Sequence, residues 1–233
     1  MAKHVLLNNI EHKDVRIVTQ RGAAYGDDVM LAITFPSEFR DLQAHYPIVF
    51  RKSADGASFE PVVLFGFQDR ENLFLSDAGW DAAYLPLAVE RQPFLIGMSD
   101  GEPLVHIDMA SPRVSRAEGE AIFMAHGSNT DFLEHVNSTL RAIYQGVQTT
   151  PAFIAALLEH QLLEAFALDV ELDDGSQNRL LGFYTINEEK LNALGGEVIA
   201  QMHQAGYLQA IYMALASLSN FRALIERKNR RHA

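Results

Sequence analysis

Residues 72–97 read NLFLSDAGWDAAYLPLAVERQPFLIG and contain the only tryptophan of the chain, Trp80. We expect Asn72–Leu75 to form a short strand, because three of its four residues are large and apolar. The next four residues are typical of a turn in which Gly79 takes the left-handed conformation. The stretch therefore predicts that Trp80 re-enters the core directly after a turn.

Two prolines limit the second half of this stretch. A residue that precedes proline is disfavoured in helical conformation, so Leu85 before Pro86 and Gln92 before Pro93 are expected to be extended. At most about two helical turns fit between them. Phe94–Ile96 then predicts a strand.

The side chains of the stretch suggest a core and a candidate ligand site. Its aromatic residues are expected to plug the core or, alternatively, to offer a stacking platform to a ligand: Trp80, Tyr84 and Phe94. Arg91 lies between apolar neighbours, so we expect its guanidinium to pair with a carboxylate such as Glu90 or Asp81. Binding of a substrate anion is the alternative role. The candidate ligand-binding residues are therefore Trp80, Tyr84 and Arg91.

The composition is that of an ordinary globular protein, with 233 residues, 48% hydrophobic and 21% charged. The absence of cysteine excludes disulfides, thiolate nucleophiles and cysteine-ligated metals. A net charge of −11 disfavours nucleic-acid binding, which depends on neutralising phosphates. The first residues lack the apolar centre of a signal peptide, and no apolar run reaches the roughly 18 residues of a membrane span. We therefore expect a cytoplasmic protein without nucleic-acid or membrane partners.

A basic cluster interrupts the acidic balance near the end of the chain. It consists of Arg222, Arg227, Lys228, Arg230 and Arg231, with Glu226 among them. We expect a solvated last helical turn and tail, because cations are favourable at a helix C-terminus. A docking site for an acidic partner is the alternative.

Strand patterns dominate the first half of the chain. Asp55-Gly56 indicates the turn of a hairpin over residues 46–67, and a second hairpin is expected over residues 94–107. Other expected elements are short strands at residues 4–7, 15–18 and 30–34, and one helical turn capped by Ser37 at residues 36–42.

Two short patterns in this half resemble chemical motifs. Ser99 is the serine of a G-x-S-x-G pattern, but a strand follows instead of a helix, which predicts a β-turn and not a nucleophile. His106 and Asp108 share one face of a strand and are weak candidates for metal ligands. A third ligand would have to come from His126, His135, His160 or His203, none of which lies in a distinctive context. We expect no metal and no cofactor.

From about residue 113 the apolar residues recur at helical intervals. Thr150-Pro151 is typical of a helix start. A hairpin is expected at residues 168–186, around Asp174-Gly175. The expected helices cover residues 115–124, 130–148, 150–162, 187–194, 198–205 and 207–227.

The order of elements predicts an α+β fold. Residues 1–112 are the strand-rich part, with antiparallel hairpins, and residues 113–233 are the helical part, which contains the hairpin 168–186. We expect them to form one continuous domain, because no low-complexity linker separates them.

Several spaced proline and aromatic motifs carry a family resemblance. They are Phe35–Phe39, Tyr46–Phe50, Leu64–Gly66 with Asn72–Phe74, Gly79-Trp80 with Tyr84–Pro86, Arg91–Phe94, Asn129-Thr130, Leu181–Phe183 to Glu189, and Gly206-Tyr207 with Ser217–Asn220. In these motifs the chain resembles the SapC family of bacteria over nearly its full length. The family takes its name from a locus for a surface-layer protein. Its genes often lie near those of tryptophan-halogenase-like flavoproteins, cupin-like oxygenases and outer-membrane receptors. The resemblance implies no particular catalytic residue.

Three functional hypotheses follow from these observations. The first is an accessory protein without catalysis of its own, which binds a peptide, a small molecule or a partner enzyme, for example of a flavin-dependent halogenase or cupin-like oxygenase system. The second is an enzyme acting on a peptide or sugar with Arg91, Glu90, His106 and Asp108. The third is a surface-layer-associated assembly protein. For this third hypothesis the interface is the apolar last helix with the basic tail. A homodimer is a further alternative.

Overall fold

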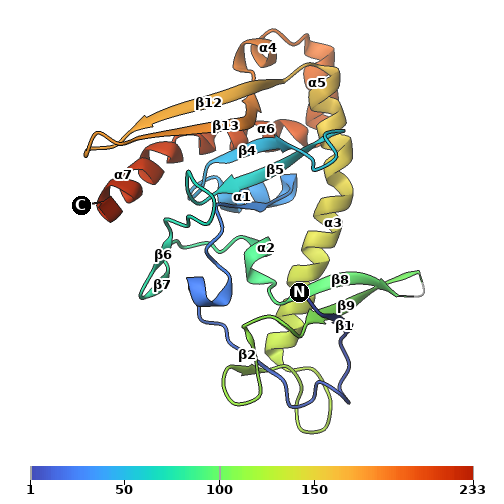
Figure 1. Cartoon of the computed structure of the whole chain (residues 1–233). Helices are drawn as coiled ribbons and strands as arrows, with labels where there is room; N and C mark the ends of the chain where they lie inside the picture. The colour runs from blue at the N-terminus through green and yellow to red at the C-terminus, as the bar shows by residue number, and fades with distance from the viewer. Residues whose placement is uncertain (1, 100, 233) are drawn as a thin grey trace. The chain divides into compact units, whose positions relative to one another are not determined.

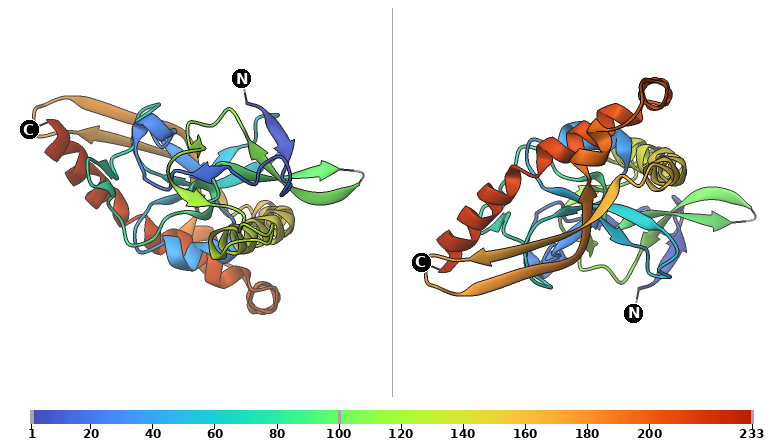
Figure 2. Two further views of the ribbon diagram at one scale, coloured as in Figure 1. Left: turned by 90° about the horizontal axis from the view of Figure 1, so that it is seen from below. Right: turned by 90° about the horizontal axis from the view of Figure 1, so that it is seen from above.

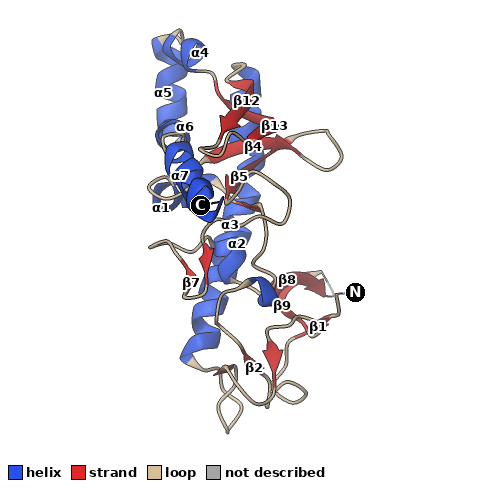
Figure 3. Ribbon diagram, turned by 60° about the vertical axis from the view of Figure 1, so that its left-hand side comes forward, coloured by secondary structure: helices blue, strands red, loops and turns tan. Residues whose placement is uncertain are grey.

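The protein is described by a computed structural model that covers residues 2–99 and 101–232. It has the α+β fold that the sequence predicts, with strands concentrated in the first half and helices in the second (Figures 1 and 3). Every strand pairing among the described residues is antiparallel. The hairpins expected at residues 46–67, 94–107 and 168–186 are confirmed.

The chain divides into two compact units, and each unit takes residues from both sides of residue 112. The first unit comprises Met1–Asp27, Leu75–Asp81 and Leu87–Gln145, and the second comprises Asp28–Phe74, Ala82–Pro86 and Gly146–Ala233. The helix α3 (Asp131–Glu159) contributes residues to both.

Two three-stranded sheets and a small ribbon build the first unit. One sheet has the order β1-β9-β8 (His4–Leu6, Glu102–Asp108, Phe94–Ser99) and the other the order β10-β2-β11 (Val114–Ser115, Arg16–Ile17, Glu120–Ala121). The ribbon pairs β6 (Leu75–Ser76) with β7 (Gly79–Trp80), and two short helices, η1 (Ala23–Tyr25) and α2 (Leu87–Glu90), complete the unit. Its core contains Val15, Ile17, Phe94, Ile107, Ile122, Phe123, Leu133, Val136 and Leu140.

The structure of residues 72–97 differs from the expected plan at two points, the first strand and Trp80, which follows the turn but is only half-buried. The strand predicted at Asn72–Leu75 is displaced, because β6 covers Leu75–Ser76 and Asn72–Phe74 lie before it. Gly79 has the expected positive φ, at 108°. The helix between the two prolines is the single turn α2.

The helix predicted at residues 115–124 is wrong, because this segment forms β10 and β11 on the two sides of β2. Ser115 has capping-box spacing, but its Oγ accepts hydrogen bonds from the N–H groups of Ala117 and Glu118 in a turn. Gly119 follows with φ 97°, and its Cα faces the backbone of Ile17 so closely that a Cβ would collide with it. Glycine therefore permits the close strand approach that replaces the helix.

The second unit is built on a five-stranded sheet with the order β12-β13-β4-β5-β3. The strands are β3 (Leu31–Ile33), β4 (Ile48–Lys52), β5 (Phe59–Leu64), β12 (Leu163–Glu171) and β13 (Gln177–Ile186). Its helices are η2 (Pro36–Glu38), α1 (Phe39–Leu42), α4 (Glu188–Asn192), α5 (Gly196–Gln204), α6 (Tyr207–Ser217) and α7 (Asn220–His232). Figure 2 shows α6 and α7 running beside the long β12–β13 hairpin.

Two helix boundaries in this unit differ from the prediction. The helix start predicted at Thr150 is wrong, because α3 continues through Pro151. The side-chain hydroxyls of Thr149 and Thr150 both donate to the carbonyl of Gly146 at 2.9 Å, and Phe153 just beyond is fully buried. Packing of this face outweighs the one hydrogen bond that proline removes.

The helix predicted over residues 207–227 is two helices, α6 and α7. Side chains at their junction bind other backbone segments: the Asn220 amide donates to the carbonyls of Gln43 and Tyr46, and the Ser217 hydroxyl accepts from the N–H of Ile48. Among the described residues, Tyr207–Arg231 is the one segment long and apolar enough to cross a membrane by length and composition. A core helix of a soluble protein passes the same test, so length and composition alone do not make this segment a membrane span.

Gly146 provides a test of the packing of α3. In an exposed helix, Gly→Ala stabilises by about 1 kcal/mol. Here the new Cβ would overlap ring carbons of the buried Phe35, so we expect Gly146→Ala to destabilise by about 1–3 kcal/mol. Gly196→Ala in α5 is the matched control, because no atom lies within 4 Å of the added methyl. Urea unfolding should give changes in unfolding free energy of opposite sign for the two variants. Equal stabilisation by both would contradict the packing described.

Candidate functional site

The aromatic residues of the 72–97 stretch do not form one plug. Phe94 is fully buried in the core of the first unit, as expected. Trp80 is half-buried on β7, opposite Leu75. Tyr84 is half-buried in the second unit, where its hydroxyl donates to Glu38 Oε1 at 3.1 Å. Trp80 and Tyr84 therefore belong to different units.

The predicted pairing of Arg91 with a carboxylate is wrong. Arg91 Nη1 donates to the carbonyl oxygen of Phe94 at 2.6 Å, and burial lowers the pKa of the guanidinium. Among the described residues, no carboxylate lies within 4.0 Å of it. Glu90 instead contacts His135 Nε2 at 3.0 Å and Thr139 Oγ1 at 3.4 Å.

The two motif-like patterns lie on the β8–β9 hairpin. Ser99 is at the end of a strand and a second strand follows, as predicted, but its Oγ also lies 3.4 Å from His106 Nε2. Gly97 leaves room for the imidazole, since a Cβ there would collide with the ring. Asp108 starts a turn, accepting from the N–H of Ala110 at 3.0 Å. The described part of the chain contains no group of three or more His, Asp or Glu that could hold a metal ion.

The second unit joins several of the spaced motifs around a buried carboxylate. Glu38 is 2% exposed and accepts hydrogen bonds from the hydroxyls of Thr34, at 2.6 Å, and Tyr84, at 3.1 Å. The hydroxyl of the buried Tyr46 donates to the carbonyl of Tyr84, and Asn220 donates to the carbonyl of Tyr46. Hydrogen bonds thus join family motifs that lie 38 positions apart, at Tyr46 and Tyr84, and 174 positions apart, at Tyr46 and Asn220.

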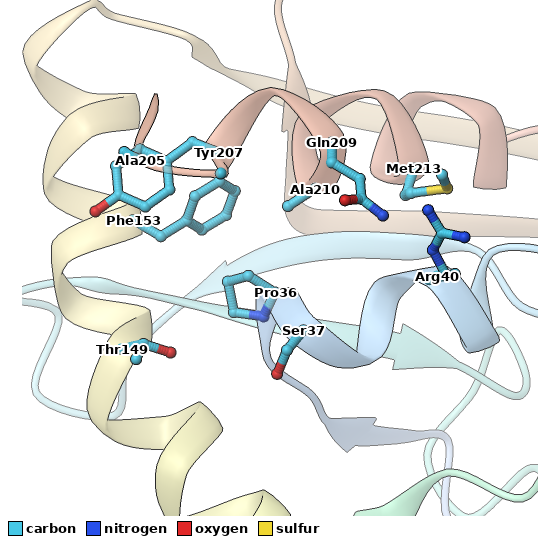
Figure 4. A pocket seen from close by; sticks show the side chains of 11 residues that line it. Pro36, Ser37, Arg40, Thr149, Phe153, Ala205, Tyr207, Gln209, Ala210 and Met213 are labelled. Carbon is cyan, nitrogen blue, oxygen red and sulfur yellow. The ribbon is translucent and has the colours of Figure 1, made fainter. Parts of the chain in front are cut away.

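A hollow of about 420 Å³ lies beside this network and is our candidate site (Figure 4). Three segments distant in sequence build it: η2 with α1, the second half of α3, and the start of α6. Its lining consists of Pro36, Ser37, Arg40, Thr149, Phe153, Ala205, Gly206, Tyr207, Gln209, Ala210 and Met213. Two of the family motifs, Phe35–Phe39 and Gly206-Tyr207, therefore meet at one surface.

The hollow combines a positive charge with an aromatic wall. With the Gln209 amide oriented to satisfy its neighbours, its oxygen accepts from Arg40 Nε at 2.9 Å and Nη2 at 2.8 Å. Within the described residues Arg40 has no carboxylate within 4.0 Å, so its charge is not neutralised. Tyr207 packs edge-on against Phe153, with ring centroids 5.5 Å apart. Figure 4 shows Arg40 and Gln209 at one end of the hollow and the two rings at the other.

Sequence reasoning missed this site. Arg40, Gln209 and Tyr207 have no motif spacing that links them, because α1 and α6 are more than 160 positions apart. The available signal was indirect: both segments carry motifs of the family resemblance.

Fold and site define an α+β protein of two units with a ligand-sized hollow in the second. The SapC family profile matches residues 7–224, so the chain belongs to the SapC family. No curated protein and no solved structure matches the chain.

Proposed function

We propose that the protein is a binding protein without catalysis of its own and that its hollow in the second unit holds a carboxylate-bearing ligand, such as a peptide C-terminus or a small organic acid. The observation that carries this proposal is Arg40. A guanidinium matches a carboxylate with two parallel hydrogen bonds, and Arg40 faces the hollow without an acidic partner among the described residues. Its Nη1 makes no hydrogen bond to another described group, so it is available to a ligand.

The apolar part of the lining supports a ligand with a hydrophobic body. Phe153, Tyr207 and Met213 offer aromatic and thioether surface beside the charge. A few polar groups that fix orientation within an apolar wall are typical of small-molecule sites.

The chemistry of the lining favours binding over catalysis. Among the described residues that line the hollow there is no His, Asp, Glu or Lys, and Tyr207 is the one side chain of a type that serves as a general acid or base. In the proposed role, the protein presents its ligand to a partner, for example an enzyme of a flavin-dependent halogenase or cupin-like oxygenase system, in the cytoplasm.

The proposal is tested with N-acetyl-L-phenylalanine and its amide, which differ only in the carboxylate. We expect the acid, and not the amide, to shift the NMR signals of the Arg40 Nε–H and the Gln209 side-chain amide. Arg40→Gln should weaken binding of the acid by about tenfold or more, because it removes a charge-assisted pair.

Arg222→Gln is the matched control, because Arg222 is an exposed arginine of the same unit that pairs with Glu226. It should leave binding unchanged. Equal affinity of wild type for acid and amide, or equal loss in the two variants, would overturn the proposal. Thermal melting of each variant shows that the fold is retained.

A further inference from the structure

The first unit contains a second hollow, of about 250 Å³, that the proposed function does not use. It is lined by His4 of β1, by residues between α2 and β8 and on β8 itself, by Asp108 at the end of β9, and by Ser111. The full lining is His4, Arg91, Gln92, Pro93, Leu95, Asp108 and Ser111. A hollow of this volume holds a molecule of amino-acid size.

Arg91 supplies a positive charge that the protein leaves without a counter-ion. One nitrogen, Nη1, donates to the Phe94 carbonyl, and Nε and Nη2 have no partner among the described residues. These two nitrogens are not sealed from solvent, because Arg113 Nε is the one fully buried side-chain nitrogen or oxygen of the described residues that lacks a partner. A half-buried, unneutralised guanidinium is unfavourable, and an anion bound beside it would relieve that cost.

Burial is the one cause that lowers the pKa of Arg91. No carboxylate raises that pKa in opposition, although Asp108 lines the same hollow. Asp108 and the guanidinium of Arg91 form no ion pair within 4.0 Å, although both line the hollow.

Asp108 supplies a fixed negative charge. Its Oδ1 accepts from the N–H of Lys3 at 2.7 Å and from the N–H of Ala110 at 3.0 Å, which holds the carboxylate in place. Its Oδ2 makes no hydrogen bond to a described residue. The carboxylate thus keeps one oxygen for an external donor.

We propose that this hollow binds a free amino acid in its zwitterionic form, with the α-carboxylate at Arg91 and the α-ammonium at Asp108. Pro93 and Leu95 line the same hollow and suit a small aliphatic side chain. A peptide of several residues fits less well, because its two terminal charges lie farther apart than one hollow of this size spans. The site lies in the other unit from the Arg40 hollow, so it stands independently of the proposed function.

Three probes separate the two charges of the ligand: L-valine, N-acetyl-L-valine, which lacks the ammonium, and L-valinamide, which lacks the carboxylate. We expect saturation-transfer NMR and titration calorimetry to show binding of L-valine to wild type. Each derivative should bind at least about tenfold more weakly than L-valine, because each loses one charge-assisted contact.

Each of two variants should lose discrimination for a different charge of the ligand. Arg91→Gln is expected to abolish the difference between L-valine and L-valinamide, because the carboxylate loses its partner. Asp108→Asn keeps an oxygen for the two backbone N–H groups and should bind L-valine no better than N-acetyl-L-valine. Arg116→Gln and Glu118→Gln, at exposed positions of the same unit, are the matched controls and should bind like wild type.

Wild type that fails to bind L-valine, or that binds L-valinamide equally well, overturns the proposal without any variant. Loss of binding in Arg116→Gln equal to that in Arg91→Gln also overturns it. The Arg40 tests use a different ligand and a different hollow, so failure of either proposal leaves the other measurable.

Discussion

Asp27→Ala is expected to lower the free energy of unfolding by about 3–5 kcal/mol, because it leaves a buried guanidinium without its counter-ion. Asp27 and Arg113 are both 0% exposed, and Arg113 Nη2 lies 2.7 and 2.6 Å from the two carboxylate oxygens. Arg113 Nη1 also donates to the carbonyls of Val18 and Gln20. The pair therefore connects residues 18–27 to the turn before β10.

A second guanidinium increases the expected effect. Arg21 lies 3.5 Å from Asp27, and burial, followed by the positive charge of Arg113, lowers the pKa of Arg21. Asp27 opposes that shift. Without Asp27, the buried Arg113 and the half-buried Arg21 repel each other and both lack this carboxylate.

The neighbouring residue offers the control. Asp28 pairs with Arg70, whose side chain is 78% exposed, so solvent screens this ion pair and Asp28→Ala should have only a small effect. Chemical denaturation of wild type, Asp27→Ala and Asp28→Ala measures the difference in unfolding free energy. Equal unfolding free energies for Asp27→Ala and Asp28→Ala would contradict a structural role for the buried pair.

Glu71→Ala is expected to destabilise the second unit by a similar amount, about 3–5 kcal/mol. Lys228 is 1% exposed, and its Nζ donates to Glu71 Oε1 at 2.7 Å. The other oxygen, Oε2, accepts from the N–H of Phe67 at 2.7 Å. Loss of the carboxylate leaves a buried ammonium and an unpaired N–H, and α7 should loosen first, because Lys228 lies on it.

Amide hydrogen exchange locates this effect. We expect faster exchange in α7 of Glu71→Ala and unchanged exchange in Glu226→Ala, which removes an exposed glutamate of the same helix paired with Arg222. Unchanged protection of α7 in Glu71→Ala would show that the buried pair does not hold the helix.

This pair also corrects the interpretation of the basic cluster near the end of the chain. The sequence predicts a solvated last turn and tail, but Lys228 is buried and Arg227 lies 4.4 Å from the ring centroid of Phe74. Arg222 and Arg230 are exposed as expected. The partners of Lys228 and Arg227 lie more than 150 positions earlier in the chain, beyond the range of any local pattern.

Local signals predicted the elements that depend on local chemistry. Asn187 caps α4 by accepting from the N–H of Lys190, and Asp174-Gly175 turns the β12–β13 hairpin. The predictions failed where a distant contact decides the conformation. Gly119 allows β11 to approach β2, and the packing of α3 carries that helix through Pro151.

The candidate sites divide in the same way. The sequence singled out Arg91 and Asp108, and the structure places both at one hollow. The structure also assigns Trp80 and Tyr84 to different units, and Glu90 contacts His135 instead of Arg91. The Arg40 hollow could not be predicted, because its three wall segments are joined only by the tertiary fold.

The sequence by itself determined the α+β class, the three main hairpins, the absence of cysteine chemistry and the membership of the SapC family. These depend on turn residues, periodicity and motifs that act over a few positions. Only the tertiary structure decided the two interleaved units, the buried charge pairs and the two hollows. The physical reason is that a charge or a cavity wall is defined by what lies opposite in space, and in this chain those partners come from distant segments.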